Sequence, residues 1–233
     1  MGKTSSARRA STNSHNTSFI RTRTGPRRRT QPPQTLVRKA NDTPIEGLKE
    51  WLDKHLQPPK SIKERKKPLD WNVYDGPTIQ ANEDLKAQIW DLFEENMKEL
   101  YEEANDPQNE WNPTEKENFL FNELSRFIII QNKEGKVKAF SMFRFKAEKN
   151  YRKKTESLLY IYDIQVAEGF RGIGICRRVL IALENIAQEL RIEHVMLMCL
   201  KDNTQALIIF EHLGYNIHMT TTATQKVFSK SID

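Results

Sequence analysis

A short glycine-containing loop, Arg171–Cys176, has the residue types best suited to bind a ligand. It follows an apolar and aromatic run from Leu158 to Val166 and precedes apolar residues at helical spacing from Cys176 to Leu190. The expected order is therefore strand, glycine loop, helix. Backbone N–H groups at a helix N-terminus suit phosphate or pyrophosphate. Glycines before a helix are also ordinary turn residues, and the spacing matches neither G-x-G-x-x-G nor G-x-x-x-x-G-K.

A carboxylate interrupts the apolar strand that leads into this loop. Asp163 stands among apolar residues, and a buried carboxylate is costly unless it is paired or used. Tyr160 and Tyr162 share one face of the same strand and fit either a packed core or a site. The five histidines do not cluster in the sequence, and neither a zinc-type Cys/His set nor a Ser/His/Asp signature is visible.

A second cluster, downstream of the loop, narrows the interpretation. Asn203-x-x-Ala206-x-x-x-Phe210-x-x-x-Gly214-Tyr215 follows a strand-like His194–Leu200. The two blocks together resemble the GNAT superfamily of N-acetyltransferases, whose pyrophosphate loop reads Arg/Gln-x-x-Gly-x-Gly/Ala. Here it reads Arg171-x-x-Gly174-x-Cys176, so a cysteine replaces the last small residue. The resemblance implies an α/β (α+β) fold, with a mixed and mostly antiparallel central sheet flanked by helices on both faces. It also implies acetyl-CoA as cosubstrate, no metal, and direct attack of an amine on the thioester.

Further stretches resemble the NatD branch of N-terminal acetyltransferases, which modify histone H4 and histone 2A. They are Asn96-Met97-x-x-x-Tyr101…Glu110-Trp111, Ala139-Phe140-Ser141-x-Phe143-Arg144-Phe145, Tyr160-x-Tyr162-Asp163-x-Gln165, and Val195-Met196-Leu197 leading to Asn203. The likeness spans roughly residues 80–219. It implies selectivity for histone tails that begin Ser-Gly-Arg-Gly.

The resemblance assigns cofactor contacts and catalytic groups. The cofactor contacts would be Gln165, Val166, Ala167, Arg171, Gly172, Ile173, Gly174, Ile175, Cys176, Arg177, Arg178, Asn203 and Phe210. The Val166 backbone N–H would stabilise the oxyanion. Asp163 replaces a longer family Glu, which favours proton transfer through a water over direct contact. Phe210 cannot protonate the CoA thiolate, so the thiolate leaves unaided or Tyr160 or Tyr162 serves.

The resemblance also assigns a substrate wall. Its members would be Tyr101, Trp111, Lys146, Ala147, Glu148, Tyr160, Tyr162, Met198 and Gln225. Glu148 would accept the substrate arginine in a charge-assisted hydrogen bond. Lys146 stands where the family has an acidic residue and would repel that arginine unless it points away. Residues 83–123 carry thirteen acidic and three basic side chains, and such a surface would attract a basic substrate.

Charge and composition divide the chain into three parts. Residues 1–40 contain ten Lys/Arg and no Asp or Glu, which predicts a disordered basic tail before a mildly acidic remainder. Residues 41–82 form an expected extension that packs on the domain, and 83–233 the acetyltransferase domain. The stretch 26–29 could serve nuclear import or nucleic-acid contact or be merely solvated, and Met1–Ser6 fits the N-myristoylation pattern.

The expected setting of the protein follows from its cysteines and hydropathy. Cys176 and Cys199 fall inside predicted elements, which favours reduced thiols in the nucleus and cytoplasm. No apolar run approaches membrane-spanning length, and no secretory signal is visible. The expected partners are the tails of histone H4 and histone 2A, with ribosome or nucleic acid through the basic tail, for a monomeric protein.

The expected elements follow from periodicity and turn residues. They are helices at Ile45–His55, from Asn82 onward, from Cys176 and at Asn203–Leu213, and strands at Arg126–Gln131, Val137–Phe145, Leu158–Val166, His194–Leu200, Tyr215–Met219 and Thr224–Lys230. Residues 105–114 would form a loop that acts as a lid or binding wall. Lys146–Ser157 would be a polar connection, and the segment around Trp71 and Tyr74 irregular.

Two other classes of function stay open from the sequence. One is an acetyltransferase of the same fold that acts on lysine side chains or small amines. The other is an inactive acetyltransferase fold that serves as a binding module, tethered to chromatin, nucleic acid or ribosomes by the basic tail. The departures at Lys146, Cys176 and Phe210 favour the binding module, whereas Arg171 and Asn203 favour an enzyme.

Overall fold

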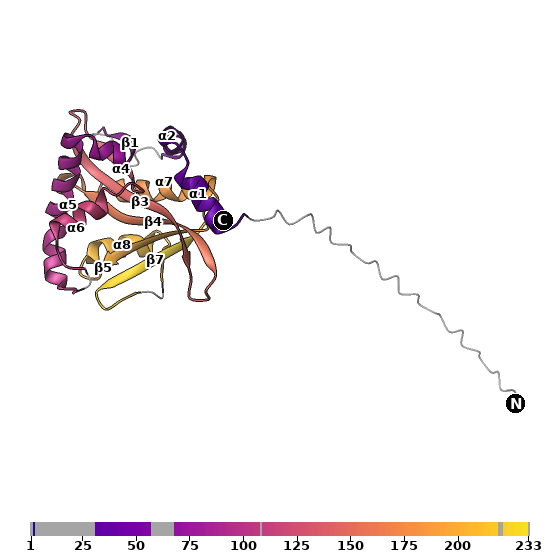
Figure 1. The fold of residues 1–233 in the computed structure, drawn as a ribbon. Helices are drawn as coiled ribbons and strands as arrows, with labels where there is room; N and C mark the ends of the chain where they lie inside the picture. The colour runs from indigo at the N-terminus through magenta and orange to yellow at the C-terminus, as the bar shows by residue number, and fades with distance from the viewer. Residues whose placement is uncertain (1, 3–30, 57–67, 108, 219–220, 233) are drawn as a thin grey trace. The chain divides into compact units, whose positions relative to one another are not determined.

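The computed structural model describes residues 2, 31–56, 68–107, 109–218 and 221–232. The expectations for residues 3–30, including the basic stretch 26–29 and most of the N-myristoylation pattern, lie outside these described residues. Residues 31–233 form one unit built on a seven-stranded sheet in the order β1-β2-β3-β4-β5-β7-β6 (Figure 1). Neighbouring strands are antiparallel except for β4 and β5, which are parallel. This is the mixed, mostly antiparallel sheet that the sequence predicts.

The bounds of the elements are as follows. The strands are β1 (Asp70–Asp75), β2 (Arg126–Gln131), β3 (Val137–Lys149), β4 (Thr155–Val166), β5 (His194–Leu200), β6 (Asn216–Ile217) and β7 (Gln225–Ser231). The helices are α1 (Pro33–Asn41), α2 (Ile45–His55), α4 (Gly76–Gln80), α5 (Glu83–Ala104), α6 (Pro113–Leu120), α7 (Ile175–Glu189) and α8 (Thr204–His212), with a 3₁₀ turn at Glu168–Phe170.

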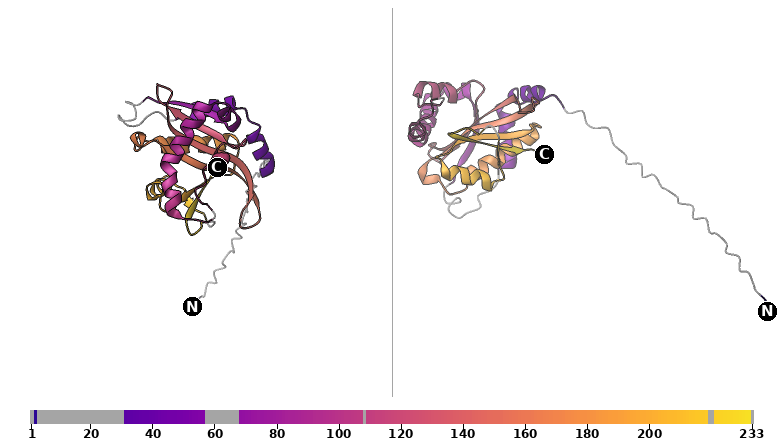
Figure 2. Two further views of the ribbon diagram at one scale, coloured as in Figure 1. Left: turned by 60° about the vertical axis from the view of Figure 1, so that its left-hand side comes forward. Right: turned by 90° about the horizontal axis from the view of Figure 1, so that it is seen from below.

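Both faces of the sheet are covered by helices, and β2 shows why, since its residues are apolar at successive positions. Ile128 and Ile130 pack in a cluster with residues of α1, α2 and α7, whereas Phe127 and Ile129 pack in another cluster with α5. Successive side chains of a strand point to opposite faces, so a run of apolar residues requires cover on both sides. The helices on the two faces confirm the predicted fold class (Figure 2).

The N-terminal part differs from the expectation. The predicted disorder is wrong for residues 33–40, because α1 occupies them with Pro33 in its first turn and Leu36 and Ala40 buried. The segment around Trp71 and Tyr74 is not irregular. It forms β1, an edge strand on β2, with Trp71 and Val73 buried.

Three connections also differ. The β3–β4 hairpin is longer than predicted, so the polar connection shrinks from Lys146–Ser157 to residues 150–154, where the Asn150 side chain accepts from two backbone N–H groups. Residues 113–114 belong to α6 rather than to the predicted loop, because the Asn112 side chain caps that helix by accepting from the Glu115 N–H over 3.2 Å. The strand expected at 215–219 is only Asn216–Ile217, and Met219 lies outside the described residues.

Candidate active site

A β-bulge in β4 sets the direction of the central carboxylate. Met142 of β3 lies opposite Asp163 and Phe143 lies opposite Ile161, so Tyr162 is the extra residue. Strict alternation would place Asp163 beside Ile161, in the cluster under α7. Instead Asp163 shares a face with its partner Met142, on the α5 side of the sheet. Bulges re-aim side chains in this way beside functional sites.

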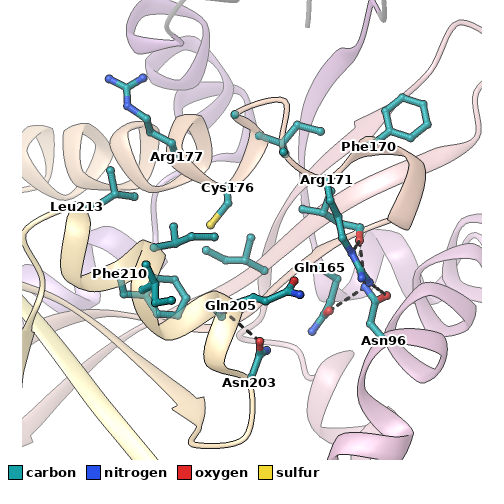
Figure 3. Close-up of a pocket in the computed structure, with 18 of the residues that line it drawn as sticks. Asn96, Gln165, Phe170, Arg171, Cys176, Arg177, Asn203, Gln205, Phe210 and Leu213 are labelled. Atoms are coloured by element: carbon teal, nitrogen blue, oxygen red, sulfur yellow. Dashed lines mark hydrogen bonds between the residues drawn. The ribbon is translucent and has the colours of Figure 1, made fainter. Parts of the chain in front are cut away.

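The parallel pair β4–β5 separates before its strands end. The ladder stops at Ile161 and Leu197, yet β4 continues to Val166 and β5 to Leu200. A cavity of about 660 Å³, the loop cavity, lies beside this opening. Its lining comes from α5, the end of β4, the glycine loop, α7 and α8 (Figure 3), and includes Asn96, Gln165, Val166, Arg171, Gly172, Gly174, Ile175, Cys176, Arg177, Asn203 and Phe210.

The glycine loop is shaped to receive an anion. Gly172 and Gly174 have φ values of 71° and 91°, the left-handed region that glycine adopts at little cost. A Cβ atom on Gly172 would meet nothing within 4 Å, so the backbone is open to a ligand. Among the described residues, no side chain caps α7 and no acidic residue lies in its first turn. These features fit a pyrophosphate.

Cys176, in the first turn of α7, directs its sulfur into the loop cavity (Figure 3). Burial raises the pKa of this thiol to about 12, so it is uncharged at neutral pH. Both Cys176 and Cys199 are free cysteines, with Cys176 partly buried and Cys199 buried.

Hydrogen bonds connect the glycine loop to Asp163. Arg171 donates to the Asn96 Oδ1 atom over 2.6 Å, and Asn96 Nδ2 donates to Gln165 Oε1 over 3.1 Å (Figure 3). Gln165 Nε2 in turn donates to Asp163 Oδ1 over 3.1 Å. These hydrogen bonds fix the orientation of the Gln165 side-chain amide, because Asn96 donates to its oxygen and its nitrogen donates to Asp163.

The backbone of Val166 faces away from β3. Val166 lies opposite Ala139, while the next pair is hydrogen-bonded through the Ala167 N–H and the Lys138 carbonyl, 2.9 Å apart. In an antiparallel ladder the neighbouring pair then directs its N–H and C=O outward. Consistently, the Val166 carbonyl accepts from Asn96 and Arg171 at 3.3 and 3.1 Å. The Val166 N–H therefore points toward the opening between β4 and β5.

A second cavity of about 910 Å³, the carboxylate cavity, adjoins the first along β4 and α5. Tyr162 and Asp163 line this cavity, whereas Ile164 and Gln165 line the loop cavity. Its other linings include Tyr101, Asp106, Asn109, Glu110, Glu115, Lys116, Phe119, Met198 and Gln225. Four carboxylates against one ammonium give this cavity an acidic character.

Asp163 is suited to exchange a proton near neutral pH. Burial raises the pKa of its carboxyl to about 7, against opposing effects of the Gln165 hydrogen bond and of the Lys116 and Arg144 charges. Burial and the charge of Asp163 together raise the pKa of Tyr101 far above its usual range. Tyr101 therefore keeps its proton at physiological pH and cannot act there as a base.

Aromatic rings form the wall behind Tyr101. Trp111 stacks on Trp90 and Phe93 at 6.0 and 5.9 Å and lies 5.9 Å from Tyr101. Trp111 thus supports Tyr101 from behind, and only Tyr101 of this pair lines the carboxylate cavity.

Lys146 and Glu148 pair with each other on β3. Their charged atoms are 2.7 Å apart, and the Lys146 ammonium lies 3.9 Å from the centre of the Tyr160 ring. Lys146 therefore lies on the same face as Tyr160 and Tyr162, whose rings are 4.6 Å apart. Lys146 therefore does not point away from the predicted substrate wall. The Glu148 carboxylate already has a cationic partner in Lys146.

The structure separates several predicted site residues from the two cavity linings. Ile173 and Arg178 are buried under the other face, with the Arg178 guanidinium 4.6 Å from the Trp71 ring. Ala167 packs in the α5 cluster, and Tyr160 packs with Met196 and Val227. Phe210 is an exception, because it does line the loop cavity, where it also packs against Phe228 with ring centres 5.6 Å apart. Ala147 lies in β3 beside Lys146 and lines neither cavity.

Sequence reasoning missed the residues contributed by α6 and the loop before it. Lys116 and Phe119 of α6 line the carboxylate cavity and lie beyond the predicted loop 105–114. Asn109 also lines it and lies within that loop, but the sequence did not single it out. The signal was present, because Asn112-Pro113-x-Glu115 combines an N-cap, a first-turn proline and an early acidic residue.

Comparison with known proteins identifies the class. The sequence profile described as acetyltransferase (GNAT) family matches residues 87–215, more than half of the chain. The chain belongs to this family and is an acetyltransferase of the GNAT type. GNAT acetyltransferases use acetyl-CoA. The open glycine backbone and the uncapped helix at the loop cavity fit the pyrophosphate of that cosubstrate.

Two solved structures share the fold at low sequence identity. A GNAT-family acetyltransferase from Staphylococcus aureus Mu50 is 12% identical over 71% of this chain and 100% of that chain, with a TM-score of 0.53. PaiA N-acetyltransferase from Thermoplasma acidophilum, solved with coenzyme A, is 9% identical over 70% and 99%, with a TM-score of 0.51. The chain spans 66% of nourseothricin acetyltransferase, with 18% identity over 47% of this chain and a TM-score of 0.39.

Membrane-spanning helices and metal-binding clusters are both absent from the described residues. None of the helices there is both long and apolar enough to cross a membrane. Within the same residues, no group of three His, Cys, Asp or Glu side chains could hold a metal ion.

Proposed function

We propose that the protein transfers the acetyl group of acetyl-CoA to the N-terminal α-amine of histone H4 and histone 2A, whose tails begin Ser-Gly-Arg-Gly. The single observation that carries the proposal is the meeting of the two cavities at Asp163–Gln165 of β4. One cavity fits the cosubstrate, and the other is acidic and wide enough for the end of a peptide.

The proposed chemistry uses few groups of the chain. Acetyl-CoA, when bound, supplies an activated acyl thioester. Asp163 accepts a proton from the incoming ammonium, directly or through a water, and an α-amine with a pKa near 8 gives up that proton readily. The Val166 N–H donates to the acetyl oxygen as negative charge develops on it.

The departing thiolate has no obvious acid. Phe210 lacks a hydroxyl, Tyr160 is buried away from the loop cavity, and burial raises its pKa well above the usual range. Tyr162 lines only the carboxylate cavity. We propose that the thiolate leaves without a protein acid, which is feasible because a thiol is a good leaving group at neutral pH.

Acidic side chains support a cationic substrate. Asp106, Glu110 and Glu115 line the carboxylate cavity together with Asp163. They would attract a protonated amino terminus and a basic peptide and would disfavour acidic peptides. The substrate wall proposed here comprises Tyr101, Tyr162, Met198 and Gln225, which line this cavity, with Glu148 and Lys146 beyond it.

One observation favours a second candidate function. Lys146 neutralises the carboxylate that would bind a substrate arginine. An acetyltransferase for small amines, or for lysine side chains in other sequences, would not need that carboxylate. We retain this as the alternative to a histone N-terminal specificity.

The proposed cellular setting follows from the proposed substrate. The protein would act as a monomer in the nucleus and cytoplasm, and the basic tail would contact nucleic acid or ribosomes. These assignments depend on the histone specificity.

The test is acetylation of full-length histone H4, followed by peptide mapping. Label from acetyl-CoA confined to the N-terminal residue supports the proposal. Label on internal lysines, with an unmodified N-terminus, overturns it in favour of a lysine acetyltransferase.

A further inference from the structure

Lys116 is fixed over the carboxylate cavity by two contacts from outside its own helix. Its ammonium lies 3.9 Å from the centre of the Tyr101 ring of α5. It also donates to Asn109 Oδ1, in the loop between α5 and α6, over 2.5 Å. The ammonium is therefore held at the cavity wall instead of extending into solvent, and Asp163 lines the same cavity.

The charged and titratable groups around Asp163 come from four elements and one loop. They are Tyr101 of α5, Asp106 and Glu110 of the loop, Glu115 and Lys116 of α6, Arg144 of β3 and Tyr162 of β4. Arg144 and Lys116 are the two cations in this set. Arg144 is engaged elsewhere, because it donates to Ser125 Oγ over 3.1 Å and to the Phe119 carbonyl, and covers the Phe119 ring at 4.4 Å. Lys116 is the cation on the cavity surface.

We propose that Lys116 is a positioning residue, whose fixed ammonium favours the ionised form of the Asp163 carboxyl, the form that accepts a proton from the incoming amine. The inference rests on the proposed role of Asp163 as the base. Burial alone favours the uncharged carboxyl, and a nearby cation opposes that effect. Removing the cation should therefore leave Asp163 protonated over a wider range of pH.

The first experiment measures rate against pH for the full chain, with acetyl-CoA and a peptide that has a free α-amine. Lys116→Met should move the acidic limb of the profile up by about one pH unit. Activity should then fall several-fold at about pH 6 and change little at about pH 9. Lys116→Arg keeps the charge and should return the limb toward its original position.

A matched control is available at another lysine that contacts α6. Lys86 of α5 pairs with Glu117 of α6 at 2.8 Å, outside the lining of the carboxylate cavity. Lys86→Met therefore removes a lysine contact to the same helix without removing a charge from the cavity. It should leave the acidic limb where it is.

The second experiment reads the carboxyl directly, by carbon NMR titration of the labelled Asp163 side chain. The signal is assigned from its absence in Asp163→Asn. A higher titration midpoint in Lys116→Met than in the unmodified protein and Lys86→Met supports the inference. An unchanged midpoint overturns it, whatever happens to activity. If the midpoint moves and the rate profile does not follow, Lys116 acts on the carboxyl as inferred, and the role of Asp163 as base is what fails.

Discussion

Gln165 donates from Nε2 to Asp163 Oδ1 over 3.1 Å, and this bond joins the linings of the two cavities. Gln165 itself is oriented by Asn96, which Arg171 of the glycine loop binds in turn. A residue of the cosubstrate site thus reaches the proposed base through two intervening side chains. The bulge at Tyr162 makes the arrangement possible, because it turns the face that Asp163 and Gln165 share toward α5.

Replacing the carboxylate tests the role of Asp163. Asp163→Asn should lower kcat by about a hundredfold, the lower range for loss of a general base, with little change in acetyl-CoA affinity. The unmodified enzyme should lose activity as pH falls through about 7, because protonation removes the base. The variant should lack that limb. An intact acidic limb in the variant would show that another group produces it.

Replacing Asn96 tests the hydrogen bonds that support the glycine loop. Asn96→Ala removes hydrogen bonds to Gln165, to the Val166 carbonyl and from Arg171. Acetyl-CoA affinity, measured by calorimetry, should weaken about fivefold, since a net hydrogen bond contributes about 1 kcal/mol. Asp91→Ala, at an exposed position of the same helix, is the control. Equal affinities for the two variants would remove Asn96 from the site.

The Lys146–Glu148 pair tests recognition of the substrate arginine. Lys146→Ala should lower KM several-fold for Ser-Gly-Arg-Gly peptides, because it frees Glu148 to bind the substrate arginine. The expected change in KM is modest because ion pairs between half-exposed side chains are weak. Glu148→Gln should raise KM for the same peptides. Neither change should affect peptides with alanine at the third position. Equal effects on both peptide series would contradict the proposed contact.

Truncation tests the revised boundary of the folded unit. A chain starting at residue 31 should keep its thermal stability and its activity on a free peptide. A chain starting at residue 42 loses the buried Leu36 and Ala40 of α1. Burial of one leucine side chain contributes about 2 kcal/mol, so Tm should fall by several degrees. Identical melting curves for the two chains would show that α1 contributes nothing to the fold.

The elements with strong periodicity were predictable, and those governed by distant contacts were not. The apolar run of β4 and the helical spacing of α7 predicted the strand, the glycine loop and the helix that border the loop cavity. By contrast, α1 looked like part of a polar tail, because only Leu36 and Ala40 are buried and their partners lie far along the chain. β1 was missed for the same reason, since its hydrogen bonds come from β2.

Site geometry was predictable only where it depends on local sequence. Asp163 was identified from its burial cost alone. The bulge that turns it toward α5 could not be foreseen, because it depends on register against β3. The pairing of Lys146 with Glu148 likewise depends on rotamers, which a sequence pattern does not specify.

The most direct test of the central claim is acetyl transfer from labelled acetyl-CoA to two peptides of the sequence Ser-Gly-Arg-Gly-Lys-Gly, one with a free α-amine and one with a blocked α-amine. We predict transfer to the free peptide alone. Equal transfer to both peptides would contradict N-terminal chemistry and indicate acetylation of the lysine, and transfer to neither would contradict this substrate class.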